Sequence, residues 1–218
     1  MTALAWVPDP DDEEERRFLD VYGAWDPLTP VELAGLMTGF PEPWWVVGGH
    51  SIEAFTGVPR FHEDIDLVVF ADALPALRAQ FRGVFDLWSN HGGTSRVIDD
   101  RQPEPLHPLA QVWMRENARS PWRVDCPVNP SRDGRWLSKR DDDMVRDLDD
   151  VTWVAGDGVR YLVPEVALHH KAKQVRAKDD VDLANVLPLL SEDRRSWLRD
   201  AIRKTYGDDH EWLDRLDA

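Results

Sequence analysis

The sequence predicts an α+β fold: a mixed β-sheet flanked by helices, followed by a C-terminal helical part. Short apolar runs that suit buried strands are spread between residues 44 and 128. Helical patterns with clear start signals precede these runs, and helical patterns follow a hairpin signal near residue 157. We therefore expect an α/β domain over residues 1–160, with a helical N-terminal extension over about 1–40, and a helical region over 161–218.

Composition and charge limit the functions that fit this chain. The 218 residues are 42% hydrophobic and 31% charged, which is typical of a globular protein that can bury a core. With 26 basic and 41 acidic residues, the formal net charge is −15. This charge makes nucleic acid an unlikely partner and suits a cationic one, although it also fits a protein whose acidity only aids solubility.

The sequence also predicts the compartment. No apolar run approaches the roughly 20 residues of a membrane span, and the N-terminus lacks the basic-then-apolar order of a signal peptide. The only cysteine, Cys126, rules out an internal disulfide and a cysteine-rich zinc site. We expect a cytoplasmic protein that is not bound to a membrane, while its oligomeric state is not indicated.

The first elements are helical. An acidic helix is expected over residues 9–22. A second begins at Thr29, which can cap it, with Pro30 at the first helical position and Glu32 completing a capping box. This helix should run to about Thr38.

The predicted sheet begins after two prolines. An apolar strand over 44–47 ends at a Gly-Gly pair, and a short helix follows over 50–56. A second buried strand is expected over 64–70. The next elements are a helix over 72–82, strands over 84–88, 94–98, 109–115 and 122–128, and a polar loop with at most a short helix over 129–150.

The last third changes character. An Asp-Gly pair at 157–158 predicts a hairpin over 151–163. Helices are expected from Pro164 to about residue 177, and over 179–190 and 192–206.

Asp64 and Asp66 are the first candidates for chemistry. Positions i and i+2 of a strand share a face, so the two carboxylates should project side by side. Burying like charges without a partner costs several kcal/mol, and a divalent cation such as Mg²⁺ removes that cost. The alternative is an exposed strand end at which both carboxylates bind arginine or backbone N–H groups.

Gly48 and Gly49 lie between a buried strand and a helix. Small residues at a helix start allow backbone N–H groups to approach a phosphate, and Ser51 adds a hydroxyl donor. A Gly-Gly pair alone more often marks only a tight turn. Its combination with two aspartates on the next strand is a stronger indication of a phosphate and metal site.

Asp125 is the third acidic candidate. Along the expected strand 122–128, Arg123 and Asp125 face one way while Val124 and Cys126 face the other. If this strand neighbours 64–70, Asp125 joins the acidic pair as a metal ligand or a general base. The alternative is an aspartate paired with a nearby arginine.

These motifs together resemble the polymerase-β-type nucleotidyltransferase superfamily. The resemblance lies in the runs VVGGHS over 46–51 and RFHEDIDL over 60–67, and in Asp125 on a later strand. The second run is most similar to small bacterial aminoglycoside and lincosamide adenylyltransferases. The segment from Pro164 to about residue 190 is similar to the helical region that follows the catalytic half of such enzymes. His50 departs from the aromatic or small residue expected after the glycines.

The resemblance implies a reaction and its site. Asp64 and Asp66 would hold one or two Mg²⁺ ions, and Gly48, Gly49 and Ser51 would cradle an NTP, most simply ATP. A hydroxyl of a small acceptor, which the net charge suits to be cationic, would attack the α-phosphate, and pyrophosphate would leave. Asp125 would be a base or a third metal ligand.

Several basic residues are candidates for nucleotide binding. Lys171 and Lys178 are seven residues apart and should share one helix face, where they neutralise phosphates or are simply solvated. Arg60 and His62 precede the acidic pair and either contact phosphate or belong to a surface loop. The neighbouring pair His169-His170 is interpreted as structural.

Three functional hypotheses stay open. The first is NMP transfer to a small molecule, for which the acidic run Asp141-Asp142-Asp143 would be either a solvated loop or a lip that attracts a cationic antibiotic. The second is a toxin–antitoxin or abortive-infection enzyme that modifies tRNA or a protein. The third is a non-catalytic nucleotide-binding module.

Overall fold

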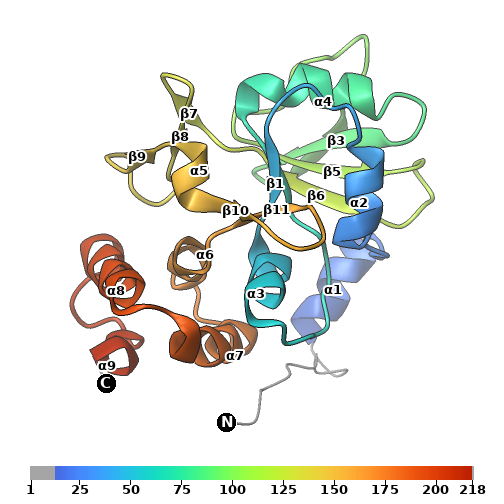
Figure 1. Cartoon of the computed structure of the whole chain (residues 1–218). Coiled ribbons are helices and arrows are strands. Elements are labelled where there is room, and N and C mark those ends of the chain that lie inside the picture. The colour runs from blue at the N-terminus through green and yellow to red at the C-terminus, as the bar shows by residue number, and fades with distance from the viewer. Residues whose placement is uncertain (1–12, 218) are drawn as a thin grey trace.

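The computed structural model describes residues 13–217, and two four-stranded sheets form its centre (Figure 1). The first sheet has the order β10-β11-β1-β2, and the second has the order β4-β3-β5-β6. The strands of the first sheet are β1 (Trp44–Val46), β2 (Leu67–Val69), β10 (Thr152–Val154) and β11 (Arg160–Leu162). Those of the second are β3 (Asp86–His91), β4 (Thr94–Val97), β5 (Gln111–Arg115) and β6 (Val124–Pro127).

The two sheets meet where β2 runs parallel to β6. Parallel bridges join Asp66 to Asp125 and Phe70 to Asn129. The backbone N–H of Asp125 donates to the carbonyl of Ile65 at 3.0 Å. The parallel junction therefore brings the segment that carries Asp64 and Asp66 beside the strand that carries Asp125, as the sequence required for a shared site.

Helices surround the sheets (Figure 1). The helices before residue 100 are α1 (Glu13–Tyr22), α2 (Pro30–Leu36), α3 (Gly48–Thr56) and α4 (Leu74–Gln80), the last preceded by a 3₁₀ turn over Ala71–Ala73. The later ones are α5 (Leu148–Val151), α6 (Pro164–Lys171), α7 (Ala177–Val186), a 3₁₀ turn over Leu187–Leu189, α8 (Glu192–Tyr206) and α9 (Leu213–Asp217). The part of the first predicted helix before residue 13 lies outside the described residues.

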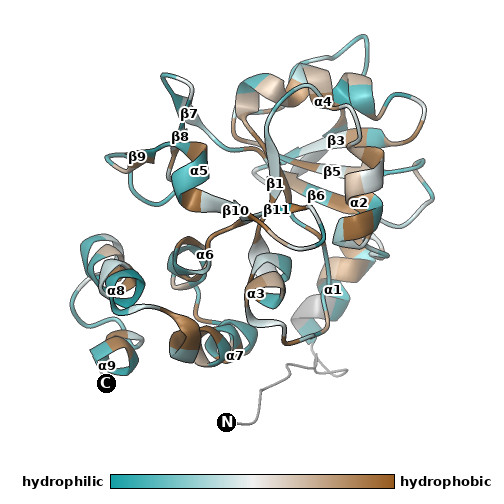
Figure 2. Ribbon diagram, in the orientation of Figure 1, coloured by the Kyte–Doolittle hydropathy of each residue, from teal (hydrophilic) through white to brown (hydrophobic). Residues whose placement is uncertain are grey.

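Two apolar cores lie on opposite faces of the first sheet, because neighbouring strand residues point to opposite sides. Val46 and Leu67 belong to the core shared with the second sheet. Trp45 and Val68 face the core formed with α6, α7 and α8. Helix α8 buries only one edge, and most of the rest of its ribbon is hydrophilic (Figure 2).

Local signals were reliable guides to element starts and turns. Helix α2 has the predicted capping box: Glu32 N–H donates to Thr29 Oγ1 at 3.3 Å, and Thr29 N–H donates to Glu32 Oε2 at 2.8 Å. The predicted hairpin is β10–β11, which turns through Gly156–Gly158. The predicted strand over 64–70 is shorter, since β2 covers only Leu67–Val69.

Two predictions about the second half were wrong. Residues 129–150 are not simply a loop, because β7 (Ser131–Arg132), β8 (Arg135–Leu137) and β9 (Val145–Arg146) form a third small sheet. The helix expected to reach residue 177 ends at Lys171. The chain turns there through Val175, whose φ of +47° is unusual for a β-branched residue and incompatible with a continuous helix.

Among residues 13–217, none of the helices combines the length and the apolar character that a membrane span requires.

Candidate active site

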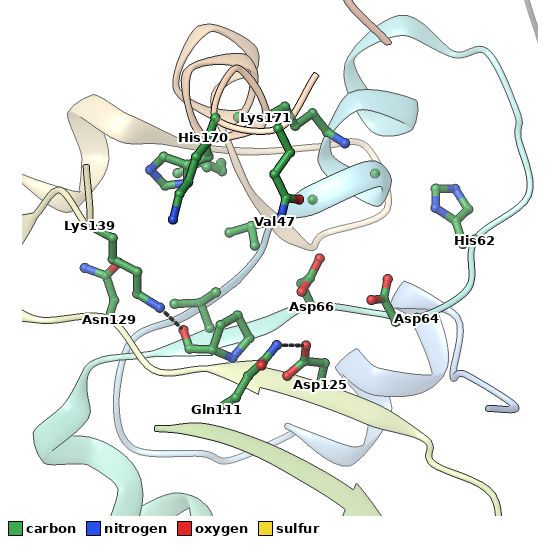
Figure 3. A pocket seen from close by; sticks show the side chains of 18 of the residues that line it. Val47, His62, Asp64, Asp66, Gln111, Asp125, Asn129, Lys139, His170 and Lys171 are labelled. Carbon is green, nitrogen blue, oxygen red and sulfur yellow. Dashed lines mark hydrogen bonds between the residues drawn. The ribbon is translucent and has the colours of Figure 1, made fainter. Parts of the chain in front are cut away.

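A cavity of about 400 Å³ lies where β1, β2 and β6 meet the helical C-terminal part. Its wall includes the Gly48-Gly49 turn, the three aspartates and residues of α6 and α7. Figure 3 shows the side chains of this wall pointing into a common space from both sheets and from α6. Segments far apart in sequence therefore share one compartment.

Asp64, Asp66 and Asp125 converge in this cavity (Figure 3). One carboxylate oxygen from each lies within 4.8 Å of the other two. Asp66 and Asp125 are held together by the β2–β6 bridge, and Asp64 shares the face of Asp66 two residues earlier. Arg123 binds Asp26 and Glu116 instead of Asp125. The three residues therefore form an acidic triad in which Asp125 has no arginine partner.

Bringing the three carboxylates of the triad together costs free energy. Burial raises the pKa of all three carboxyl groups, and burial with repulsion from Asp64 raises the pKa of Asp66 to about 7. Asp125 is 4% exposed, and its Oδ2 accepts a hydrogen bond from the Gln111 amide while its buried Oδ1 has no hydrogen-bond partner. Oxygen ligands this close suit a hard divalent cation such as Mg²⁺, which would remove the repulsion.

The Gly48-Gly49 turn is shaped around the site. Gly48 has a φ of +67°, and a Cβ there would lie 2.0 Å from Asp66 Oδ2. A Cβ at Gly49 would lie 1.9 Å from Arg60 Nη2. Side chains are therefore excluded at both positions, and the N-terminus of α3 begins directly beside the triad. Such a backbone can approach a phosphate closely.

Ser51 does not take the place predicted for it. Its side chain is fully buried, and its hydroxyl donates to the carbonyl of Gly48 at 2.8 Å. It is not part of the cavity wall. The hydroxyl therefore stabilises the turn, and we correct the prediction that it contacts phosphate.

Arg60 and Lys171 belong to a buried ionic cluster, which we define as Arg60, Lys171, Asp179 and Asp182. Arg60 Nε lies 3.1 Å from Asp182 Oδ1. Lys171 Nζ lies 2.8 Å from Asp179 Oδ1 and 2.9 Å from Asp182 Oδ2. Both basic residues line the cavity as well, but their charges are already balanced inside the protein.

Lys171 and Lys178 do not share a helix face, contrary to prediction. Lys171 ends α6 and Lys178 lies in the first turn of α7, although both line the cavity. Lys178 forms an ion pair with Glu63. The sequence pattern could not reveal the turn between these helices, because no glycine or proline marks it.

His62 is held in the wall of the cavity by two neighbours. Its Nε2 lies 2.6 Å from Glu53 Oε2, and its ring stacks on that of His50 with centroids 3.6 Å apart. Burial lowers the pKa of both histidines to about 3. The pair therefore stays neutral at physiological pH and acts by packing beside Gly49.

Sequence reasoning missed part of the cavity wall. Lys139, Gln111 and Asn129 line it, as does His170, which we had interpreted as structural. The neighbouring His169 does look structural, because it is fully buried and its Nε2 lies 3.0 Å from Thr205 Oγ1. The register between β5 and β6, which sets Gln111 beside the strand that carries Asp125, was the information needed to place Gln111 in the wall.

The acidic run after residue 140 lies away from this cavity. Asp141, in the connection between β8 and β9, accepts a hydrogen bond at Oδ2 from Lys204 at 2.7 Å. None of Asp141, Asp142 and Asp143 lines the cavity. The structure therefore offers no acidic lip from this run.

Two solved structures resemble this fold. One is the solution structure of the antibiotic-resistance factor ANT(2'')-Ia, with a TM-score of 0.52 and 18% identity over 81% of this chain and 89% of that one. The other is the crystal structure of ANT(2'')-Ia in complex with adenylyl-2''-tobramycin, with a TM-score of 0.54 and 18% identity over 82% of this chain and 99% of that one. No family model and no curated protein matches the chain. The likeness confirms the predicted α+β fold with a C-terminal helical part.

Proposed function

We propose that this protein is a Mg²⁺-dependent nucleotidyltransferase that transfers NMP, with ATP as the first candidate donor, to a hydroxyl of a small molecule. The observation that carries the proposal is the convergence of Asp64, Asp66 and Asp125 beside the Gly48-Gly49 turn. Three carboxylates this close together, none of which forms an ion pair among the described residues, need a cation, and the open backbone of the turn suits the phosphates of a nucleotide.

Each group of residues would have its own role in this reaction. Asp64 and Asp66 would hold the metal, which when bound lowers the negative charge at the reacting phosphate. The backbone at Gly48 and Gly49 would orient the outer phosphates. The acceptor oxygen bonds to the α-phosphorus as the bond to pyrophosphate breaks, and the hydroxyl proton passes to Asp125 if that residue is the base.

The small-molecule acceptor rests on the size of the cavity. A volume of about 400 Å³ lies within the usual range for ligand pockets. The crystal structure of similar fold contains adenylyl-2''-tobramycin, which supports testing aminoglycoside-like acceptors first, and the sequence resemblance adds lincosamide-like ones. Because the Asp141–Asp143 run lies elsewhere, the proposal does not require the acceptor to be cationic.

A transfer assay tests the proposal. The purified protein is incubated with Mg²⁺, each α-labelled NTP and a panel of aminoglycosides, lincosamides and simpler polyols. We expect label in an acceptor and release of pyrophosphate, both lost with EDTA. The Asp64→Asn/Asp66→Asn double variant is the matched control and should transfer nothing. Equal transfer by wild type and control would contradict the proposed site.

One observation favours a second candidate function. The cavity is lined by basic residues despite the net charge of −15, namely Arg60, Lys139, Arg140, Lys171, Lys173, Arg176 and Lys178. A local basic wall also fits an enzyme that modifies the end of an RNA, as in toxin–antitoxin relatives. Adding tRNA and a cell extract to the same panel decides between them: label in RNA or protein, with none in the small molecules, would favour this alternative.

A further inference from the structure

Lys139 enters the cavity from the connection between β8 and β9. Its Nζ donates a hydrogen bond to the carbonyl of Pro127 at 3.0 Å. Pro127 follows Asp125 by two residues on β6, a rise of about 7 Å along the strand, so the lysine amine reaches the strand that carries Asp125. Figure 3 shows Lys139 pointing into the cavity from the side opposite Asp64.

The charge of Lys139 is not paired with a carboxylate, unlike the charges of the other basic residues that were predicted to bind phosphate. Arg60 and Lys171 are balanced within the buried ionic cluster, and Lys178 binds Glu63. Lys139 forms no ion pair within 4.0 Å among the described residues, and its hydrogen bond goes to an uncharged carbonyl. Its positive charge is therefore available to a ligand.

Arg176 pairs with Asp179 at 2.9 Å, and the two remaining basic residues of the wall are also less suited. Lys173 is exposed at the turn after α6. Arg140 lies beside Tyr206, whose hydroxyl donates to the carbonyl of His169. Neither is held against β6 near the triad as Lys139 is by Pro127.

The strand pairing indicates which phosphate Lys139 can reach. Val46 pairs with Leu67 in an antiparallel ladder, so the chain continues into Gly48 toward the Asp64 end of the site. Lys139 lies at the opposite end, beside Pro127. A nucleotide whose β- and γ-phosphates lie along Gly48-Gly49 therefore places its α-phosphate between the triad and Lys139.

We infer that Lys139 is a catalytic residue that donates to a non-bridging oxygen of the α-phosphoryl group during nucleotidyl transfer. This inference rests on the proposed function. The acceptor oxygen–phosphorus bond forms, the phosphorus–pyrophosphate bond breaks, and Lys139 keeps its proton throughout. Its ammonium group stabilises the charge that the three equatorial oxygens carry in the transition state.

Substitution of Lys139 by methionine tests this role. For Lys139→Met we expect kcat to fall on the order of 10²-fold. We expect the affinity for AMP with Mg²⁺, measured by calorimetry, to fall about 3- to 10-fold. Lys204→Met is the matched control, because Lys204 binds Asp141 outside the cavity. A Lys139→Met variant with kcat within threefold and AMP affinity within twofold of wild type would overturn the inference, even if its Tm were lower.

Chemical rescue separates a catalytic role from a structural one. Alkylation of Lys139→Cys with 2-bromoethylamine creates a lysine-like side chain, and the natural Cys126 is fully buried and should not react. We expect at least tenfold recovery of kcat over the unmodified variant. No recovery in a folded, fully alkylated protein would contradict the assignment.

The same measurements separate failure of this inference from failure of the proposed function. A wild-type protein that binds AMP with Mg²⁺ but transfers nothing overturns the proposed reaction alone, and the AMP comparison then decides whether Lys139 contacts the α-phosphate. A wild-type protein that binds neither ATP nor AMP overturns both.

Discussion

The acidic triad and the buried ionic cluster are two groups of carboxylates with opposite electrostatics. In the cluster, Asp179 and Asp182 each lie within about 3 Å of a lysine or arginine nitrogen. In the triad, Asp125 Oδ1 has no partner and the pKa of each carboxyl group is raised, first of all by burial. Burial alone therefore does not distinguish the two groups; the presence or absence of an ion-pair partner does.

The comparison also changes how the basic residues are interpreted. Arg60 and Lys171 line the cavity, yet they stabilise the joint between the sheet and α7. Arg60 packs against Gly49, so the cluster supports the turn from behind. These residues can shape the proposed nucleotide site without supplying net charge to it.

The largest effect should come from removing the charge of Asp125. For Asp125→Asn we expect transfer to fall about 10²- to 10⁴-fold without loss of stability in metal-free protein, because the substitution relieves repulsion. Turnover and Tm are measured with and without Mg²⁺. An unchanged affinity for Mg²⁺·ATP would indicate a base, and a weakened affinity would indicate a metal ligand. Transfer within threefold of wild type would remove Asp125 from the site.

Breaking the buried ionic cluster should have the opposite effect, because it should lower stability. Asp182→Ala leaves Arg60 and Lys171 short of a buried carboxylate, and we expect about 3–5 kcal/mol lower free energy of unfolding in urea. Asp149→Ala is the control, since that ion pair is exposed and worth about 1 kcal/mol or less. Similar losses in both variants would refute the contrast between buried and exposed pairs.

The pH dependence of stability sharpens the contrast further. The pKa of Asp66 is about 7 in the folded protein against 3.8 normally, so between these values the folded state binds more protons than the unfolded one. Without metal, wild-type stability relative to Asp66→Asn should therefore fall as pH rises from about 4 to about 7, by up to a few kcal/mol. Chemical denaturation of both proteins in EDTA across this range measures the difference. A difference that does not depend on pH would contradict the raised pKa.

The smallest effect should be stabilisation by the metal. Mg²⁺ at about 100 times its Kd should raise the free energy of unfolding by about 2.7 kcal/mol, with Ca²⁺ and Mn²⁺ tested beside it. The Asp64→Asn/Asp66→Asn variant should show no such rise. If this variant gains as much as wild type, the metal binds elsewhere.

Local patterns predicted much of this molecule because their causes are local. The capping box at Thr29, the Gly-Gly turn and the spacing of Asp64 and Asp66 each depend on a few neighbouring residues. The proximity of Asp125 was predicted only under the condition that its strand neighbours the other, and the β2–β6 junction met that condition.

The rest depended on contacts between distant segments. Lys139 has no motif around it, and it reaches the cavity only because the third small sheet returns toward β6. The separation of Lys171 from Lys178 depends on a turn at Val175 that has no glycine or proline. The partners of Arg60 and Lys171 lie on α7, which helical periodicity alone could not pair with them.

Because β2 and β6 are joined in parallel, the site depends on which residues of each strand face the cavity. Asp66 and Asp125 face the cavity together because their bridge fixes the alternation of both strands. A shift of either strand by one residue would turn a carboxylate into the apolar layer and an aliphatic side chain into the cavity. Insertions in the long connection between the strands leave that alternation intact, so this connection is free to vary in length while the strand ends are not.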